Sequence, residues 1–224
     1  PYVVPREMTQ GDIDAFVAAY GKGAANALAA GFDGAEIHGA NGDIIEQFRP
    51  SPHTRRRDGY GGGIDNRIRL LREIIEAVSA HIDPARIGLR LSPTSERKGM
   101  GDADPAALTQ AVGRLAQDHG LAYIHLIEPI ASGFMEKPDY PVMDKLREVF
   151  GGVIIQNGSF DAESGAATIA DGKADAISFG RPYIANPDLV SRFRNGWDLA
   201  APDFDYAYVG EHKGYTDYPV YGGI

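Results

Sequence analysis

The sequence contains no cysteine among its 224 residues. This absence excludes disulfide bridges, iron–sulfur clusters, thiolate zinc sites and cysteine nucleophiles in this chain, and it fits a reducing compartment. Long apolar runs are also missing, since none approaches the roughly 18 residues that a membrane-spanning helix needs. The opening residues PYVVPR lack the basic stretch followed by an apolar one that marks a signal peptide. We therefore expect a cytoplasmic protein with no membrane partner.

Positive charge is scarce as well. The chain has 22 Lys and Arg residues against 31 Asp and Glu residues, which gives a net charge of −9 at pH 7. This negative balance argues against nucleic acid or an anionic membrane surface as a general partner. Apolar residues make up 43% and charged residues 24%, as in ordinary soluble globular proteins. At this length the chain can bury a core.

Two phosphate-binding fingerprints, G-x-G-x-x-G and G-x-x-x-x-G-K-[ST], do not occur, so a Rossmann or P-loop fold lacks its main support. The chain instead alternates short, mostly continuous apolar runs with amphipathic segments, which implies parallel βαβ units with both sheet faces covered. Thr9, followed three residues later by Asp12, predicts a capping box at the first helix. The expected strands are residues 32–40, 85–93, 121–129, 152–159 and 174–180, and the expected helices are 12–30, 66–80, 104–120, 141–150, 162–170 and 186–196.

The length of these units favours a barrel. Each takes roughly 35 residues, as in a (β/α)₈ TIM barrel, which typically needs about 250 residues. Five strands cannot close a barrel of eight. We therefore expect residues 1–224 to form a partial TIM-barrel domain, either as a fragment or completed by a complementary N-terminal segment or chain.

Polar residues follow the predicted strands at their carboxyl ends, where parallel α/β folds carry their chemistry. His38 and Asn41 end the first strand, and both can donate hydrogen bonds to one oxygen atom and polarise it. The alternative reading is that His38 only caps a loop. Arg90 lies inside an apolar run, and a buried guanidinium needs an anion or several acceptors. A structural ion pair and a ligand contact both fit Arg90.

The last two strands are followed by a candidate anion site. Gly158 and Ser159 precede a helix, where backbone N–H groups bind anions readily. Gly180 and Arg181 add a second backbone approach and a guanidinium. In a barrel these are the loops after the last strands, where a phosphate commonly binds. The two loops together therefore predict a phosphorylated cofactor.

Several segments, taken together, resemble the old yellow enzyme family of FMN-dependent ene-reductases: EIHGANG, EQF, RRRDGYGG, GLRLSP, LAYIHLIEP, FGRPYIANPDL and GYTDYP. They occur in the family's order and span nearly all of the chain. The resemblance begins after the family's third barrel strand, which implies that this chain supplies about the last five βα units.

The resemblance implies a barrel with FMN at its carboxyl end, NADPH or NADH as the reductant, and an α,β-unsaturated carbonyl or nitro compound as the substrate. By similarity, His38 and Asn41 hold the substrate's oxygen, and Tyr208 lines the substrate pocket. Arg90 is implied to contact the polar edge of the flavin ring. The implied phosphate-binding residues are Gly158, Ser159, Gly180 and Arg181.

Asp43 departs from the family's pattern, in which a tyrosine at this position donates a proton to the substrate's α-carbon. An ordinary carboxyl is ionised near pH 7 and cannot donate, and its charge disfavours a developing enolate. Asp43 could donate only if burial raised its pKa, and a water molecule is the other candidate donor. We expect His38, Asn41 and Asp43 to form the catalytic group, with alkene reduction slowed or altered relative to the family.

Two alternatives remain at this point. Larger relatives with an iron–sulfur cluster, such as dienoyl-CoA reductase types, are disfavoured by the absence of cysteine and by the GYTDYP segment near the end of the sequence. The alternative from another class is a non-catalytic flavin- or ligand-binding half-barrel, or a fragment that functions only with a partner chain. A yellow colour that NADPH bleaches distinguishes the enzyme from this alternative.

Overall fold

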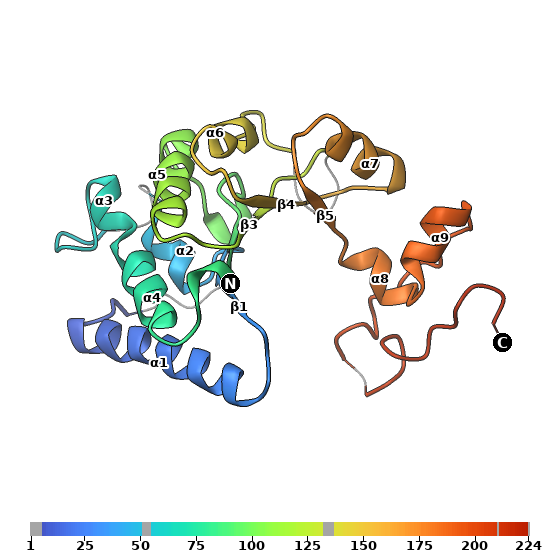
Figure 1. Ribbon diagram of the computed structural model, residues 1–224, viewed down its shortest axis with the longest axis horizontal. Coiled ribbons are helices and arrows are strands. Elements are labelled where there is room, and N and C mark those ends of the chain that lie inside the picture. Colours follow the sequence, from blue (N-terminus) through green and yellow to red (C-terminus); the bar gives the residue numbers. More distant parts are fainter. Residues whose placement is uncertain (1–5, 51–54, 132–136, 210, 224) are drawn as a thin grey trace.

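The computed structural model describes residues 6–50, 55–131, 137–209 and 211–223. Within these ranges, five parallel strands form one sheet whose spatial order follows the sequence. Figure 1 shows the sheet as an arc with helices along its convex side and an open concave side. This is an arc of a (β/α)₈ barrel, as the sequence predicted. The strands are β1 (Ala35–Gly39), β2 (Ile87–Leu91), β3 (Tyr123–Ile127), β4 (Val153–Asn157) and β5 (Ala176–Ser178).

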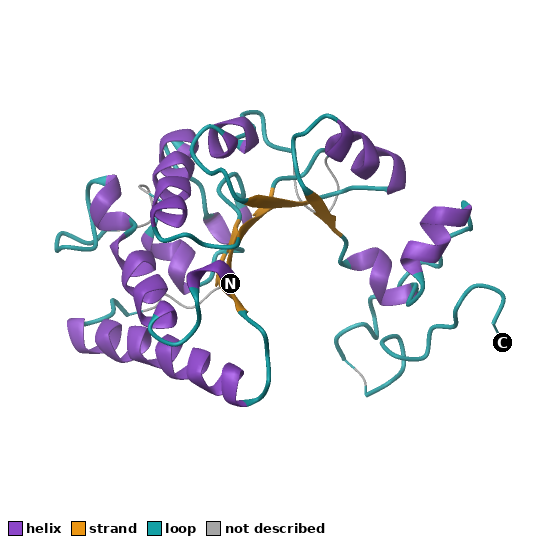
Figure 2. Cartoon of the chain, viewed as in Figure 1, coloured by secondary structure: helices purple, strands orange, loops and turns teal. Residues whose placement is uncertain are grey.

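The helices of the described residues mostly follow the prediction, with differences in the shortest ones (Figure 2). The helix expected at 66–80 is divided at Ile68. Neither α2 nor α8 was predicted, because five residues are too few to show a helical period. The helices are α1 (Gln10–Ala29), α2 (Ile44–Phe48), α3 (Ile64–Arg67), α4 (Arg69–Ser79), α5 (Pro105–Asp118), α6 (Met143–Arg147), α7 (Ala162–Ala170), α8 (Arg181–Ala185) and α9 (Leu189–Asn195), with 3₁₀ turns η1 (Pro84–Arg86) and η2 (Arg97–Gly99).

Local signals in the sequence set several helix ends. Asp12 donates its N–H to Thr9 Oγ1 at 3.2 Å while its carboxylate accepts the Thr9 N–H at 2.8 Å, so the predicted capping box is confirmed. Asp104 caps α5 by accepting the N–H of Ala107 at 2.9 Å. Gly196 ends α9 in the left-handed conformation, with φ 66°, that glycine adopts without strain.

The outer face of the sheet is the apolar core. One register row crosses four strands and is at most 2% exposed at each position: Ile37, Leu89, Ile124 and Ile154. These side chains share a hydrophobic cluster with the apolar residues of α4 and α5. Burying each of them contributes about 1.5–3 kcal/mol, so this row is a main source of the sheet's stability.

Over β1 to β3 the inner face of the sheet is polar, which corrects the expectation from the apolar runs; on β4 the same rows continue with Val153 and Ile155. The next register row along the strands aligns His38, Arg90 and His125 across β1, β2 and β3. These residues point to the concave side because side chains alternate between the two faces of a strand. The strands therefore alternate in polarity more than their apolar composition suggested.

Hydrogen bonds cross the concave side between strands that are not neighbours. His125 Nδ1 lies 3.0 Å from Glu36 Oε2, and its Nε2 lies 2.7 Å from Ser178 Oγ. Tyr123 also hydrogen-bonds the Glu36 carboxylate, and its ring passes over Gly88, where a Cβ would overlap it. Burial, together with the Glu36 charge, raises the pKa of the Tyr123 phenol to about 12. These contacts link β1, β3 and β5.

None of the helices in the described ranges is both long enough and apolar enough to cross a membrane.

Candidate functional site

The turn after β1 presents the residues that the sequence singled out. Asn41 and Gly42 take left-handed backbone conformations, with φ 62° and 74°. Asparagine and glycine tolerate this region better than other residues, which explains why they occur here. The N–H of Asp43 donates to the carbonyl of Ala40 at 3.3 Å and closes the turn. The side chains at 38, 41 and 43 are thereby held on a short, defined loop.

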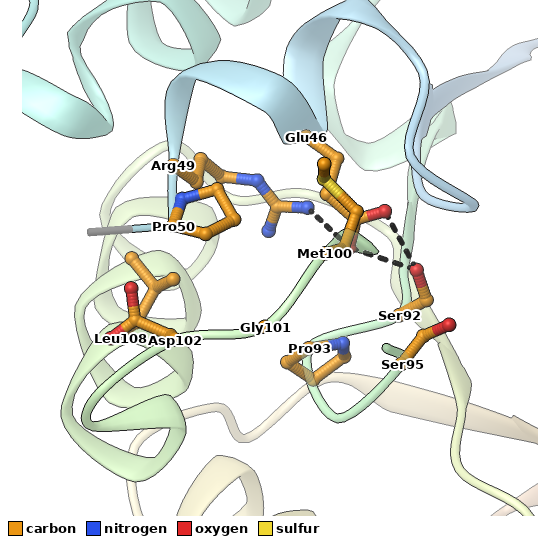
Figure 3. A pocket seen from close by; sticks show the side chains of 10 residues that line it. All are labelled: Glu46, Arg49, Pro50, Ser92, Pro93, Ser95, Met100, Gly101, Asp102 and Leu108. Carbon is orange, nitrogen blue, oxygen red and sulfur yellow. Dashed lines mark hydrogen bonds and ion pairs between the residues drawn. The ribbon is translucent and has the colours of Figure 1, made fainter. Parts of the chain in front are cut away.

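The buried carboxylate of Glu46 holds this turn in place through hydrogen bonds. Glu46 of α2 is 3% exposed and accepts the Gly42 N–H at 2.6 Å. Ser92, just after β2, donates to Glu46 Oε1 at 2.8 Å (Figure 3). The same hydroxyl accepts the Asn41 N–H at 2.8 Å. Two consecutive backbone N–H groups of the turn are therefore satisfied by one connected pair of side chains.

Two buried arginines pair with the buried carboxylates that support the turn. Arg49 donates to the carbonyl of Gly39 and lies 3.4 Å from Glu46 Oε1. Arg67 pairs with Asp102 at 2.6 Å, and both side chains are almost fully buried. Burial lowers the pKa of Arg49, while the charges of Glu46 and Asp102 oppose that shift. The cluster joins α2, α3 and the loop after β2 into one support for the turn.

On the side of the turn that reaches solvent, the Asp43 carboxylate lies between two nitrogen donors. Its Oδ2 is 3.1 Å from His38 Nε2, and its Oδ1 is 2.7 Å from Lys98 Nζ. The hydrogen bond from Lys98 is the largest cause of a lowered pKa for Asp43, and the charges of Lys98 and His38 add to it against burial. The raised pKa that would let Asp43 act as an acid is therefore not found. All three side chains reach solvent, with 34–51% of each exposed.

Arg90 lies beside His38 in the register and has few partners of its own. Its Nη2 is 3.5 Å from Asn157 Oδ1, a long hydrogen bond, and its buried Nε has no partner among the described residues. Of the two readings of the sequence, a structural ion pair is not found for Arg90 among the described residues, although its charge is one of the smaller causes that lower the pKa of the Glu36 carboxyl. An unsatisfied buried donor costs about 1–3 kcal/mol, so a ligand acceptor on the concave side would stabilise Arg90.

The two candidate anion loops follow neighbouring residues of the sheet. Asn157 and Ser178 are register partners, and Asn157 Nδ2 donates to the Ser178 carbonyl at 2.9 Å. Gly158 and Ser159 then take positive φ values of 137° and 57°. A Cβ at residue 158 would lie 2.6 Å from the Cα of Pro129, so only glycine fits this approach.

The structure modifies the anion site in one respect. Asp161 already caps α7 by accepting the N–H of Ser164 at 2.8 Å, so a carboxylate occupies the end of that helix. Gly180 is the N-cap residue of α8, Arg181 begins that helix, and the Arg181 guanidinium lies 5.9 Å from the Phe204 ring. The prediction of an anion site therefore rests on the backbone at residues 158–159 and on the Arg181 guanidinium.

The structure brings some of the predicted residues together and separates others. His38 and Asp43 are in contact, and Arg90 is adjacent to His38 in the sheet. Tyr208 is 81% exposed, in the irregular C-terminal segment that lies beyond β5, away from β1 (Figure 1). Sequence reasoning missed Lys98, which has no motif around it.

Comparison with known proteins identifies relatives of this chain. A family model described as "NADH:flavin oxidoreductase / NADH oxidase family" matches residues 1–199. The chain is 37% identical over 221 residues to 12-oxophytodienoate reductase 2 of Arabidopsis thaliana, covering 97% of this chain and 59% of that protein.

Solved structures agree with this result. Morphinone reductase superposes with a TM-score of 0.93 at 40% identity, over 98% of this chain and 59% of its own. The old yellow enzyme homologue from Zymomonas mobilis gives a TM-score of 0.94 at 38% identity, over 98% and 62%. The chain thus spans about three-fifths of the length of each of these relatives.

Proposed function

Because the chain belongs to the NADH:flavin oxidoreductase / NADH oxidase family, whose cofactor is FMN, we propose that it is an FMN-dependent oxidoreductase that uses NADPH or NADH to reduce activated alkenes. The substrates of this proposal are α,β-unsaturated carbonyl or nitro compounds. The observation that carries it is the alignment of His38 at the end of β1 with Arg90 on β2, at the carboxyl edge of an arc of a (β/α)₈ barrel.

The described residues fit an FMN molecule in two respects. The unpaired Nε of Arg90 suits an acceptor on the polar edge of the flavin ring. The backbone of Gly158 and Ser159, with Gly180 and Arg181, suits the phosphate. When bound, FMN would supply the hydride that reduces the alkene.

In this proposal the substrate's oxygen binds to His38 and Asn41. Two N–H donors at one oxygen draw electron density from the conjugated alkene and make its β-carbon electrophilic. The turn that carries Asn41 is fixed by Ser92 and Glu46, so the backbone of Asn41 is held in place before the substrate binds. Tyr208 is proposed to line the pocket once the substrate is present.

We also propose that residues 1–224 are a partial barrel domain that further strands complete. In the described sheet β1 and β5 are the two edges, and eight strands close a barrel of this kind. A complementary N-terminal segment or chain would pair with these edges and cover the concave side.

The test is spectroscopic. The purified chain, mixed with FMN, is expected to turn yellow, to bleach on anaerobic addition of NADPH or NADH, and to regain its colour when 2-cyclohexenone is added. The His38→Ala/Asn41→Ala double variant should bleach as the unmodified chain does but regain colour slowly. A chain that binds FMN and is never bleached would support the non-catalytic alternative, and one that binds no FMN would contradict the proposal for the chain by itself.

A further inference from the structure

In the candidate site, Asp43 forms a hydrogen-bonded ion pair with Lys98. The two side chains are 2.7 Å apart at Nζ and Oδ1, and Asp43 in turn contacts His38 Nε2 at 3.1 Å. Lysine ammonium is a donor of three hydrogens, whereas an ionised carboxylate is only an acceptor. The site therefore contains an ammonium group that can donate a proton, next to a carboxylate that cannot.

The position of Lys98 is set by its backbone and by close packing. Lys98 and Gly99 both have positive φ values, 58° and 77°, in the η2 turn. A Cβ at Gly42 would lie 3.0 Å from the Lys98 side chain and 3.2 Å from that of Met100. The loop after β2 is thus seated directly on the turn that carries Asn41 and Asp43. The fold of this loop, and not only the length of the lysine side chain, therefore places the Lys98 ammonium at the site.

The pairing changes the electrostatics of the reaction. A lone carboxylate would repel the negative charge that develops on the substrate's oxygen and α-carbon during reduction. With Lys98 attached, the pair has no net charge, and the ammonium offsets that repulsion at short range. Asp43 then serves to hold the ammonium beside His38 rather than to donate.

We propose that Lys98 is the proton donor in alkene reduction and that Asp43 is its positioning residue. This inference rests on the proposed function. The alkene gains two electrons and one hydrogen nucleus at its β-carbon, with NADPH or NADH as the source of reducing equivalents. Its α-carbon takes a proton from Lys98 Nζ, and the neutral amine recovers a proton from water through its exposed side. Carbon–carbon double-bond character is lost, and two carbon–hydrogen bonds form.

Besides Lys98, two other titratable groups in the described part of the chain interact with Asp43, and neither is assigned to the α-carbon. The groups that interact with Asp43 among the described residues are Lys98, His38 and Tyr20. Burial and, secondarily, the Asp43 charge raise the pKa of the Tyr20 phenol, which makes that phenol a poorer acid. His38 is assigned to the substrate's oxygen by the proposed function. Lys98 is the group left for the α-carbon.

The test separates the two half-reactions of the FMN-loaded chain. Lys98→Met is expected to leave anaerobic bleaching by NADPH unchanged and to slow reoxidation by 2-cyclohexenone about 100-fold or more, the usual contribution of a general acid. Lys98→Arg keeps the charge but does not release a proton near neutral pH, so it should also be slow. Lys145→Met, which removes a half-exposed lysine paired with Glu148 at 2.6 Å, is the matched control and should reoxidise normally.

A rescue distinguishes proton donation from a general loss of structure. Adding Asp43→Tyr to Lys98→Met supplies a neutral phenol beside His38 and should restore at least a tenth of the original reoxidation rate. Failure of this double variant to exceed Lys98→Met would contradict the proposal, as would a normal rate in Lys98→Met itself.

A second measurement needs no cofactor. In an NMR titration of the unloaded chain, Lys98→Met should raise the pKa of the Asp43 carboxyl towards its ordinary value, because the Lys98 hydrogen bond is the main cause of its lowering. An unchanged Asp43 titration would show that the pair does not form and would overturn the inference. If the unmodified chain binds no FMN or is not bleached, the proposed function fails, independently of this result.

Discussion

Glu46 Oε2 accepts the backbone N–H of Gly42 at 2.6 Å, and this single bond ties the buried side of α2 to the turn that carries the candidate catalytic residues. The carboxylate is also bonded to Ser92 and lies near Arg49, so it has no free acceptor position facing solvent. A buried acid with this many partners is costly to remove, because each partner is left unsatisfied.

The first prediction concerns Glu46. Replacement by alanine should destabilise the chain by about 3 kcal/mol or more, since it leaves the Arg49 charge buried without its carboxylate. Urea unfolding measures this change, and Glu163→Gln, at an exposed position of α7, should stay within about 0.5 kcal/mol of the unmodified chain. A small effect at Glu46, equal to that of the control, would show that the turn is held by other contacts.

The second prediction compares two glycines. Gly158→Ala should destabilise the chain, because φ is 137° and the new Cβ would meet the backbone of Pro129. Gly23→Ala, inside α1 with nothing within 4 Å of the new Cβ, should stabilise it by roughly 0.5–1 kcal/mol. Thermal unfolding of both variants without FMN measures the contrast. Similar melting temperatures for the two would contradict the close approach at residue 158.

The third prediction is a pH dependence. The Tyr123 phenol has a pKa of about 12, above its ordinary 10.0, so the unfolded chain loses this proton first as pH rises. The stability that Tyr123 contributes should be complete below pH 10 and should be lost as pH rises from 10 towards 12. Glu36→Gln should lower this pKa only in part, because burial is the larger cause.

Tyrosinate absorbance measures that titration, as the difference between the unmodified chain and Tyr123→Phe. Glu163→Gln removes a carboxylate far along the chain from Glu36 and should leave the Tyr123 titration unchanged. A Tyr123 pKa that Glu36→Gln does not lower would refute the contact between the two side chains.

The fourth prediction isolates the phosphate of the cofactor. Arg181→Ala should weaken FMN binding by about 10- to 100-fold, as expected for a charge-assisted hydrogen bond. Riboflavin lacks the phosphate, so its affinity should not change. Fluorescence titration with both flavins gives the comparison, and Arg194→Ala, at an exposed position of α9, is the control. Equal losses for FMN and riboflavin would place Arg181 elsewhere than at the phosphate.

Much of this architecture is predictable from the sequence for a physical reason. The outer faces of β1 to β4 and the cores of α1, α4 and α5 show regular apolar spacing, which indicates burial. Parallel strands bring their carboxyl ends to one edge, so the sequence indicates that His38 and Arg90 lie at the same edge of the sheet, where the structure makes them register partners.

What could not be predicted depends on contacts between distant segments. Lys98 follows Asp43 by 55 residues in a loop without periodicity, so nothing in the sequence links them. Glu46 lies in a five-residue helix, which is too short for a periodic sequence pattern to indicate that this acid is buried. The Asp161–Ser164 capping box is different, because its spacing is visible in the sequence and could have indicated that α7 already has an anionic cap.

The hydrogen bonds of His125 to Glu36 and Ser178 connect the first, third and fifth strands of the sheet. Because each of these bonds spans a strand, together they hold β1, β3 and β5 to one another on the concave side of the arc. Any strands that join at β1 or β5 would therefore extend an arc whose concave side is already cross-linked by its own side chains.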